Sequence, residues 1–224
     1  MSVLVIIPAA GSGSRFGGPI PKQFQLLAGK PLVQYVVERF LLGGMVDRIV
    51  VAVTEALLTT VKQASQDRVQ FVAGGDTRQQ SVMKALAADA AEYDIVAIHD
   101  AVRPFFRMRT FAALIEAARE HGAALPALPL TDTIHATCEG RLAATVDRSN
   151  LVAAQTPQCF RHEVLREALA RAEREKFDAT DEAGLAAHYG YDVRVIPGDP
   201  FNIKITRQED LELAEAHFEE WSKE

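Results

Sequence analysis

The feature that most constrains the fold is an unbroken apolar run at residues 3–7, V-L-V-I-I, followed directly by Pro8. A short run rich in β-branched residues is typical of a strand that is buried on both faces of a sheet. Proline has no N–H to donate to a neighbouring strand, so we expect the strand to end there. The chain therefore begins with the pattern of a sheet that is covered by helices on both sides.

The rest of the chain alternates between strand and helix patterns. We expect strands at residues 48–53, 69–73, 94–99, 123–128, 192–196 and 201–205. We expect helices at residues 31–42, 55–64, 76–89, 108–121, 161–175, 181–188 and 207–221. Strands separated by helices predict an α/β fold with a mostly parallel sheet and right-handed crossovers. We expect one domain that spans residues 1–224.

One segment, residues 131–146, breaks this alternation. Two strand-like stretches, 134–137 and 142–146, flank the turn Glu139-Gly140-Arg141, which is typical of a β-hairpin. An isolated hairpin is only marginally stable in water. We therefore expect an arm that docks on another surface, and a second copy of the chain is the expected partner.

The composition of the 224 residues limits the classes of function. Hydrophobic residues make up 48% and charged residues 24%, and no apolar run reaches the ~18 residues of a membrane helix. Residues 3–10 lack the basic start of a signal peptide. Cys138 and Cys159 suggest neither a zinc site nor a disulfide framework, so a cytoplasmic location is expected. A net charge of −6 argues against a general nucleic-acid binder.

The loop after the first strand, residues 9–18, consists mainly of small residues. Such a backbone can approach an anion closely, and Arg15 and Lys22 add two positive charges. We interpret it as a loop that wraps a nucleoside triphosphate. The alternative is a plain surface turn, which has no need of the two cations.

Two commoner glycine loops do not fit this stretch. In the dinucleotide motif G-x-G-x-x-G, Gly11 and Gly13 match but Phe16 occupies the third glycine position. In the P-loop motif, Gly13 and Gly18 have the right spacing, but Pro19 stands where the lysine is required.

Polar residues follow two further strands. Gly75, Asp76 and Ser81 lie between a strand and a helix, where they are expected to contact a base or ribose; alternatively, Asp76 is only a helix N-cap. Asp100 follows another apolar strand, at the edge where open parallel sheets bind ligands, and its oxygens suit Mg²⁺. The alternative is a buried ion pair between Asp100 and Arg103.

Three later residues have ordinary explanations when each is considered alone. Arg148 fits a solvated surface charge, and Thr180 fits a helix N-cap. Lys204, in a stretch with strand-like alternation, fits a lysine that points into solvent. His99 is expected to pack or cap rather than to catalyse.

Taken in order, the loops resemble one family. The motifs are P-A-A-G-S-G-S-R…P-K-Q-F, G-G-D-T-R…S, H-D-A-V-R-P, D-T-I, V-D-R…Q-T-P-Q, T-D-E-A and N-I-K-I-T-R. They resemble the methylerythritol-phosphate cytidylyltransferases of the non-mevalonate isoprenoid pathway, in register from Val3 to about Leu211. One departure is Gln208, where proline is expected, and it should affect only the start of the last helix.

The resemblance implies a Rossmann-like nucleotidyltransferase fold with a dimerisation arm, and an enzyme that makes CDP-methylerythritol and pyrophosphate with Mg²⁺. It implies that Arg15 and Lys22 stabilise the transition state, that Arg148 and Lys204 hold the incoming phosphate, and that Asp100 holds the metal. It places around CTP the residues Ala9, Ala10, Gly11, Gly13, Gly75, Asp76, Ser81, Asp100, Ala101, Arg103 and Thr156. Thr133 and Thr180 would contact methylerythritol 4-phosphate, and Thr133 and Arg148 would serve the partner's site in a homodimer.

Three other functions remain open at this point. A ribitol 5-phosphate cytidylyltransferase would share the nucleotide loops and differ in the acceptor half. A regulatory nucleotide-binding module would not need Arg148 and Lys204 for a second phosphate. One half of a bifunctional enzyme would need a second domain, which we do not expect in a chain that ends at Glu224.

Overall fold

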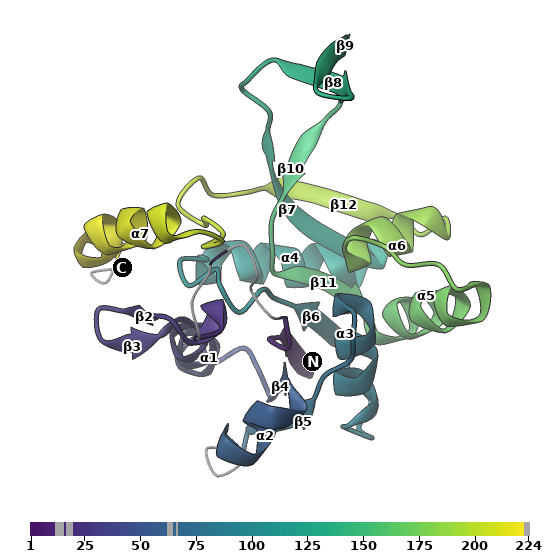
Figure 1. Cartoon of the computed structure of the whole chain (residues 1–224). Helices are drawn as coiled ribbons and strands as arrows, with labels where there is room; N and C mark the ends of the chain where they lie inside the picture. Colours follow the sequence, from purple (N-terminus) through teal and green to yellow (C-terminus); the bar gives the residue numbers. More distant parts are fainter. Residues whose placement is uncertain (12–15, 17–19, 62–64, 66, 222–224) are drawn as a thin grey trace.

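The structure, a computed structural model, describes residues 1–11, 16, 20–61, 65 and 67–221. Eight strands in this part of the chain form one sheet (Figure 1), in the order β10-β7-β11-β6-β1-β4-β5, with β12 also paired to β7. The strands are β1 (Val3–Pro8), β4 (Arg48–Val53), β5 (Val69–Ala73), β6 (Ile95–Ile98), β7 (Ala123–Pro129), β10 (Val152–Ala154), β11 (Gln158–Arg161) and β12 (Val193–Pro197).

Most of the sheet is parallel, as the alternating pattern predicts. β1 pairs in parallel with β4 and β6, β4 with β5, and β12 with β7. β10 and β11 run antiparallel to their neighbours, and neither was expected from the sequence. The sheet is therefore mixed on the side that carries the arm.

The helices in the described residues cover both faces of this sheet. They are α1 (Leu32–Leu42), α2 (Glu55–Val61), α3 (Arg78–Ala87), α4 (Met108–His121), α5 (His162–Glu175), α6 (Glu182–His188) and α7 (Gln208–Trp221). α4 begins and ends at the predicted residues, and residues 62–64 of the second predicted helix lie outside the described part of the chain. None of these helices is long and apolar enough to cross a membrane.

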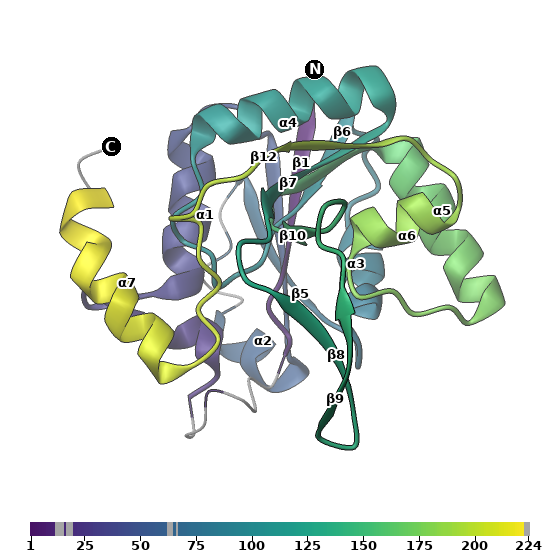
Figure 2. The ribbon, with the colours of Figure 1, turned by 90° about the horizontal axis from the view of Figure 1, so that it is seen from above.

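The first strand divides its side chains between two hydrophobic cores, as expected for a strand with both faces buried. Val3, Val5 and Ile7 pack in one core with α1 and α4, while Leu4 and Ile6 pack in the other with α3, α5 and α6. Figure 2 shows these two helical layers on opposite sides of the sheet. This arrangement confirms the predicted layers.

The chain changes direction across the sheet at β1. After β1 it continues through β4 and β5 on one side, and then returns to form β6 on the other side of β1. Open parallel sheets bind ligands at the carboxyl ends of the strands at such a switch point. The residues that follow β1 and β6, among them Ala9 and Asp100, lie at this position.

The predicted strand at residues 201–205 does not form. Asn202 N–H bonds to the carbonyl of Asp199 in a turn, and Ile205 N–H makes a single bond to the carbonyl of Val102. Ile205 is fully buried in a third core beneath α7, with Leu211 and Ala214. Packing under α7 therefore holds this segment, without sheet pairing, against the chain that follows β6.

The predicted hairpin is present as β8 (Ile134–Cys138) and β9 (Arg141–Val146). The two strands pair antiparallel with each other in a separate sheet. Nearly every residue of the hairpin is exposed, and Figure 1 shows it projecting from the body beyond β7 and β10. Both polar and apolar side chains of the hairpin are therefore exposed to solvent in the single chain.

Candidate active site

A cleft lies at the carboxyl ends of β1, β5 and β6. Its lining combines small loop residues, cations and carboxylates, namely Pro8, Ala9, Ala10, Gly11, Lys22, Gln23, Gly75, Asp76, Thr77, Arg78, Ser81, Asp100, Ala101, Val102 and Lys204. The cleft has a volume of about 160 Å³ and opens to solvent at its mouth. Lys22, Arg78 and Lys204 bring positive charge into it from three distant parts of the chain.

Two loops meet closely on one wall of the cleft because Gly74 has no side chain. A Cβ at Gly74 would lie 2.5 Å from the Cβ of Ala10 and 2.9 Å from Ser81 Oγ. Ser81 Oγ accepts a hydrogen bond from Gly75 N–H at 3.0 Å and donates to the carbonyl of Thr77 at 3.0 Å. Ser81, expected to contact a base or ribose, also holds its own loop in shape.

The helix that follows this loop is capped by Thr77. Thr77 Oγ1 accepts from Gln80 N–H at 3.1 Å, and Gln80 Oε1 accepts from the N–H groups of Asp76 and Thr77. The alternative reading of Asp76 as the N-cap of α3 is therefore wrong. Asp76 is exposed and is one of the residues that line the cleft.

Lys22 begins a short 3-10 helix, η1 (Lys22–Phe24), that a buried glutamine ties to the first loop. Gln23 is 2% exposed, and its Nε2 donates to the carbonyl of Ala9 at 2.6 Å and to that of Gly11 at 3.3 Å. These bonds fix the backbone on which Lys22 stands. The sequence analysis missed Gln23, although it directly follows the predicted lysine.

Asp100 is the electrostatic centre of the cleft. Its carboxylate lies 2.9 Å from Lys204 Nζ, 3.4 Å from Arg103 Nε and 3.6 Å from Arg78 Nε. The predicted ion pair with Arg103 therefore exists, but as one of three. Lys204 is not the purely solvated lysine that the alternating pattern allowed.

This arrangement keeps Asp100 ionised. Burial alone would raise the pKa of the Asp100 carboxyl, but Arg78, Lys204 and Arg103 together lower that pKa well below its usual range. A permanently charged, buried carboxylate next to cations that can contact phosphate is typical of a site for a metal-bound polyanion.

A buried hydrogen-bonded chain supports Asp100 from behind. Asp100 N–H donates to Thr156 Oγ1, and that hydroxyl contacts His99 Nδ1, each at 3.0 Å. His99 Nε2 lies 3.0 Å from the carbonyl of Arg103, which can only accept. Nε2 is therefore the protonated nitrogen, and Nδ1 accepts from the hydroxyl of Thr156. Burial lowers the pKa of His99 to about 4, so the ring is neutral at physiological pH.

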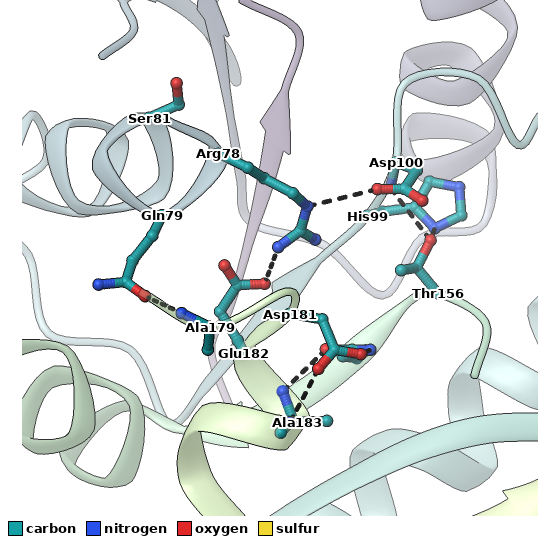
Figure 3. Close-up of polar contacts among 12 residues, drawn as sticks. Arg78, Gln79, Ser81, His99, Asp100, Thr156, Ala179, Asp181, Glu182 and Ala183 are labelled. Atoms are coloured by element: carbon teal, nitrogen blue, oxygen red, sulfur yellow. Dashed lines mark hydrogen bonds and ion pairs between the residues drawn. The ribbon is translucent and has the colours of Figure 1, made fainter. Parts of the chain in front are cut away.

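Arg78 joins the cleft to the start of α6. Its guanidinium contacts Asp100 on one side and Glu182 on the other (Figure 3), and Glu182 is 2% exposed. Burial would lower the pKa of Arg78, but Glu182 and Asp100 raise it. The sequence analysis did not select Arg78 or Glu182, because neither motif shows that α3 and α6 face each other.

Several predicted residues lie outside the cleft lining in this single chain. Thr133 and Arg148 are exposed in and beside the arm, and Arg148 Nη1 donates to the carbonyl of Thr131. Thr180 is exposed before α6, whose N-cap is Asp181, so the reading of Thr180 as N-cap is wrong. The remaining predicted positions outside the lining are Arg103 and Thr156, which support Asp100 from behind, and Gly13 and Arg15, which lie outside the described residues.

The donors in the cleft fit a metal that arrives with a nucleotide. Among the described residues, no group of three or more histidines, cysteines or carboxylates could hold a metal ion alone. Mg²⁺ is often bound by one or two carboxylates together with substrate phosphates and water. The ionised carboxylate of Asp100 in a cationic cleft matches that donor set.

A protein-family model described as IspD, 2-C-methyl-D-erythritol 4-phosphate cytidylyltransferase, matches residues 3–220. The chain belongs to this cytidylyltransferase family. The protein named 2-C-methyl-D-erythritol 4-phosphate cytidylyltransferase from Acidobacterium capsulatum is 44% identical to this chain. The alignment has 229 positions and covers 96% of each protein. Another, from Solibacter usitatus, is 41% identical over 96% of this chain and 94% of its own length.

Solved structures of cytidylyltransferases have the same fold. The enzyme titled 2-C-methyl-D-erythritol 4-phosphate cytidylyltransferase from Thermus thermophilus is 34% identical, with a TM-score of 0.82 over 98% of this chain and all of its own. That from Francisella tularensis is 30% identical, with a TM-score of 0.85 over 96% of this chain and 98% of its own. The predicted nucleotidyltransferase fold and family are confirmed.

Proposed function

We propose that the chain carries out the reaction for which its family is named, in the cleft around Asp100. CTP and 2-C-methyl-D-erythritol 4-phosphate react to give CDP-methylerythritol and pyrophosphate. The observation that carries this proposal is the meeting of Lys22, Arg78 and Lys204 with Asp100 in one cleft at the switch point of the sheet. The family match favours this acceptor over ribitol 5-phosphate, and an enzyme over a regulatory module.

The chemistry requires little proton transfer. An oxygen of the acceptor phosphate attacks the α-phosphorus of CTP, the bond from that phosphorus to the β-phosphate bridging oxygen breaks, and pyrophosphate leaves with the electron pair. The attacking phosphate is already mostly ionised at neutral pH, since its second pKa is about 6. The main obstacle is repulsion between two polyanions, so catalysis consists of positioning and charge stabilisation.

Lys22, Arg15 and Lys204 have separate roles in this reaction. Lys22, with Arg15, stabilises the charge that develops at the α-phosphate. Lys204 receives the acceptor phosphate at the other side of Asp100, from which its Nζ is only 2.9 Å away. Gly75, Asp76 and Ser81 bind the nucleoside on the wall formed by the α3 loop, together with the backbone of Ala9, Ala10 and Gly11.

Asp100 would hold Mg²⁺ together with the phosphates of CTP. When bound, the metal would neutralise part of the triphosphate charge and orient the α-phosphate. Arg103 and the chain from His99 through Thr156 keep the backbone of Asp100 in place for this contact. Ala101 lines the cleft beside it.

The arm would complete the site of a second copy of the chain in a homodimer. Thr133 and Arg148 are the predicted acceptor contacts that lie on or next to the arm, and both are exposed here. We further propose that the chain works as a single domain, because strands from Val3 to Pro197 share one sheet. The cytoplasm is its proposed location.

An assay with two acceptors tests the function. Purified protein is mixed with CTP, Mg²⁺ and either methylerythritol 4-phosphate or ribitol 5-phosphate, and pyrophosphate release is followed. We expect release with the first acceptor and a rate at least about tenfold lower with the second. Equal rates, or tight binding of CTP without turnover on either acceptor, would contradict the proposal.

A further inference from the structure

Residues 177–183, which comprise the loop before α6 and the first two residues of that helix, form a connection that carries Thr180, one of the predicted acceptor contacts. Side chains from α3 and β11 hold this connection on both sides of Thr180. The same two elements support the nucleotide cleft, so the connection links the two halves of the proposed site.

Gln79 anchors the residue that precedes Thr180. Its Oε1 accepts a hydrogen bond from Ala179 N–H at 3.1 Å, and its Nε2 donates to the carbonyl of Phe177 at 3.1 Å. Gln79 is 8% exposed. Figure 3 shows its side chain pointing toward Ala179, whereas Arg78 of the same helix points toward Asp100.

Gln158 anchors the residue that follows Thr180. Its Nε2 donates to Asp181 Oδ2 at 2.8 Å, and its Oε1 accepts from Ala183 N–H at 3.0 Å. Asp181 Oδ1 in turn accepts from Gly184 N–H at 2.8 Å, which caps α6. Gln158 is 1% exposed and belongs to β11, which pairs with β6 directly before Asp100.

We propose that Gln79 and Gln158 are positioning residues for the acceptor sugar phosphate. They fix the backbone on both sides of Thr180 and so hold its side chain where the acceptor binds. Neither residue is among those lining the cleft in the described part of the chain, so their effect is on the acceptor and not on CTP. This inference rests on the proposed function, and Arg78 with Glu182 holds the same connection from the side of the cleft.

The inference predicts a specific split between kinetic constants. A binding group on a loosened segment must be ordered each time the acceptor binds, and that entropic cost weakens acceptor binding. The nucleotide wall is held by Ser81 and Thr77 through bonds that do not involve Gln79 or Gln158, so we expect CTP binding to depend on these two glutamines much less than acceptor binding does. A general loss of structure would instead weaken the binding of both substrates.

The test compares Gln79→Ala with Gln34→Ala in the full chain. Gln34 is an exposed glutamine of α1 whose amide donates to Glu38, so its truncation removes the same group from a site far from the connection. We expect Gln79→Ala to raise the KM for the acceptor about tenfold and to leave the Kd for CTP, measured by calorimetry without acceptor, within about twofold. Gln34→Ala is expected to change neither constant.

A second variant keeps the test decisive if truncation harms folding. Gln79→Asn keeps the amide on a side chain one methylene shorter, so both bonds are weakened and not removed, and a smaller rise in acceptor KM is expected. Hydrogen exchange supplies a readout that does not require activity: the amide of Ala179 should exchange faster in Gln79→Ala, while the amides of β1 keep their protection.

Two results would overturn the inference. One is a Gln79→Ala protein that is folded and active and whose KM for the acceptor is unchanged. The other is a rise in the CTP Kd equal to the rise in the acceptor KM. Failure of the proposed function looks different, because the unsubstituted protein would then release no pyrophosphate with this acceptor.

Discussion

The Nζ of Lys204 lies 2.9 Å from Oδ2 of Asp100, although the two residues are more than a hundred positions apart in the chain. One is the proposed ligand of the metal and the other the proposed ligand of the acceptor phosphate. Each therefore neutralises the other in the protein without ligands.

Asp100→Asn is expected to impair both stability and turnover. The substitution removes the charge that Arg78, Arg103 and Lys204 share, and leaves three cations close together. Loss of a charged hydrogen-bonding partner in a buried site costs about 3 kcal/mol of unfolding free energy. Chemical denaturation measures this loss, and added salt should recover part of it by screening the cations.

The same variant should show a changed metal requirement. If Asp100 binds Mg²⁺ with CTP, a higher Mg²⁺ concentration is needed for half-maximal rate in Asp100→Asn. Asp199→Asn is a suitable control, because Asp199 pairs with Arg107 and does not line the cleft among the described residues. An identical Mg²⁺ dependence in wild type and Asp100→Asn would contradict the role of Asp100.

Lys22→Ala is expected to lower kcat by ~10²–10³, the usual effect of removing one preorganised charge contact to the transition state. Lys22 is half-buried and stands on backbone that Gln23 fixes, so its truncation should leave the melting temperature nearly unchanged. Lys30→Ala, which removes an ion pair with Glu38 and a cation–π contact with Tyr35 outside the cleft lining, is the matched control. A Lys22→Ala enzyme with near-normal kcat would refute the assignment.

The framework of the fold could be predicted from the sequence, because local patterns decide it. Residues 3–7 and 49–53 are apolar on both faces of their strands, and α4 has apolar residues at helical spacing up to Gly122, whose φ is +105°. β10 and β11 could not be predicted, because they are short and owe their extended form to pairing with β7 and β6. At residues 201–205 a strand was predicted that does not form. The alternating pattern there reflects burial of one side of an irregular segment under α7.

In the site, too, residues that belong to local motifs could be predicted, and residues that depend on contacts between distant segments could not. Lys22, Asp76, Ser81, Asp100 and Lys204 were predicted from their motifs, and all of them line the cleft. The supporting residues were missed, since a glutamine or arginine in a helix does not reveal which neighbouring element it faces. Gln23, Arg78 and Gln79 acquire their partners only when distant segments pack together.

His99 gives the protein a specific acid sensitivity. Burial lowers its pKa to about 4 from 6.5 in the unfolded chain, so between these values the unfolded state binds a proton that the folded state does not. The free energy of unfolding therefore falls as pH decreases from 6.5 to 4, by about 3 kcal/mol from this group. Denaturant titrations should show a flatter pH profile in His99→Gln than in the unsubstituted protein. Equal slopes in His99→Gln and wild type would contradict this account.

The arm is expected to act in the partner's site, and mixed dimers can reveal this. Lys204→Ala and Arg148→Ala should each be nearly inactive alone, because each removes one cation from the acceptor phosphate. In a two-fold dimer with crossed arms, a mixed pair joins one intact Lys204 to one intact Arg148 in a single site. After unfolding and refolding the two variants together, about one site in four should be active.

The mixing result separates the two possible placements of Arg148. If Arg148 acted in its own chain, every site in the mixture would lack one cation, and no activity would return. A matched mixture of Lys204→Ala with Lys22→Ala, two residues that line the same cleft, should stay inactive in either arrangement. Recovery in the first mixture alone would therefore locate Arg148 across the subunit interface, because only a residue supplied by the second chain can complement a defect in the first.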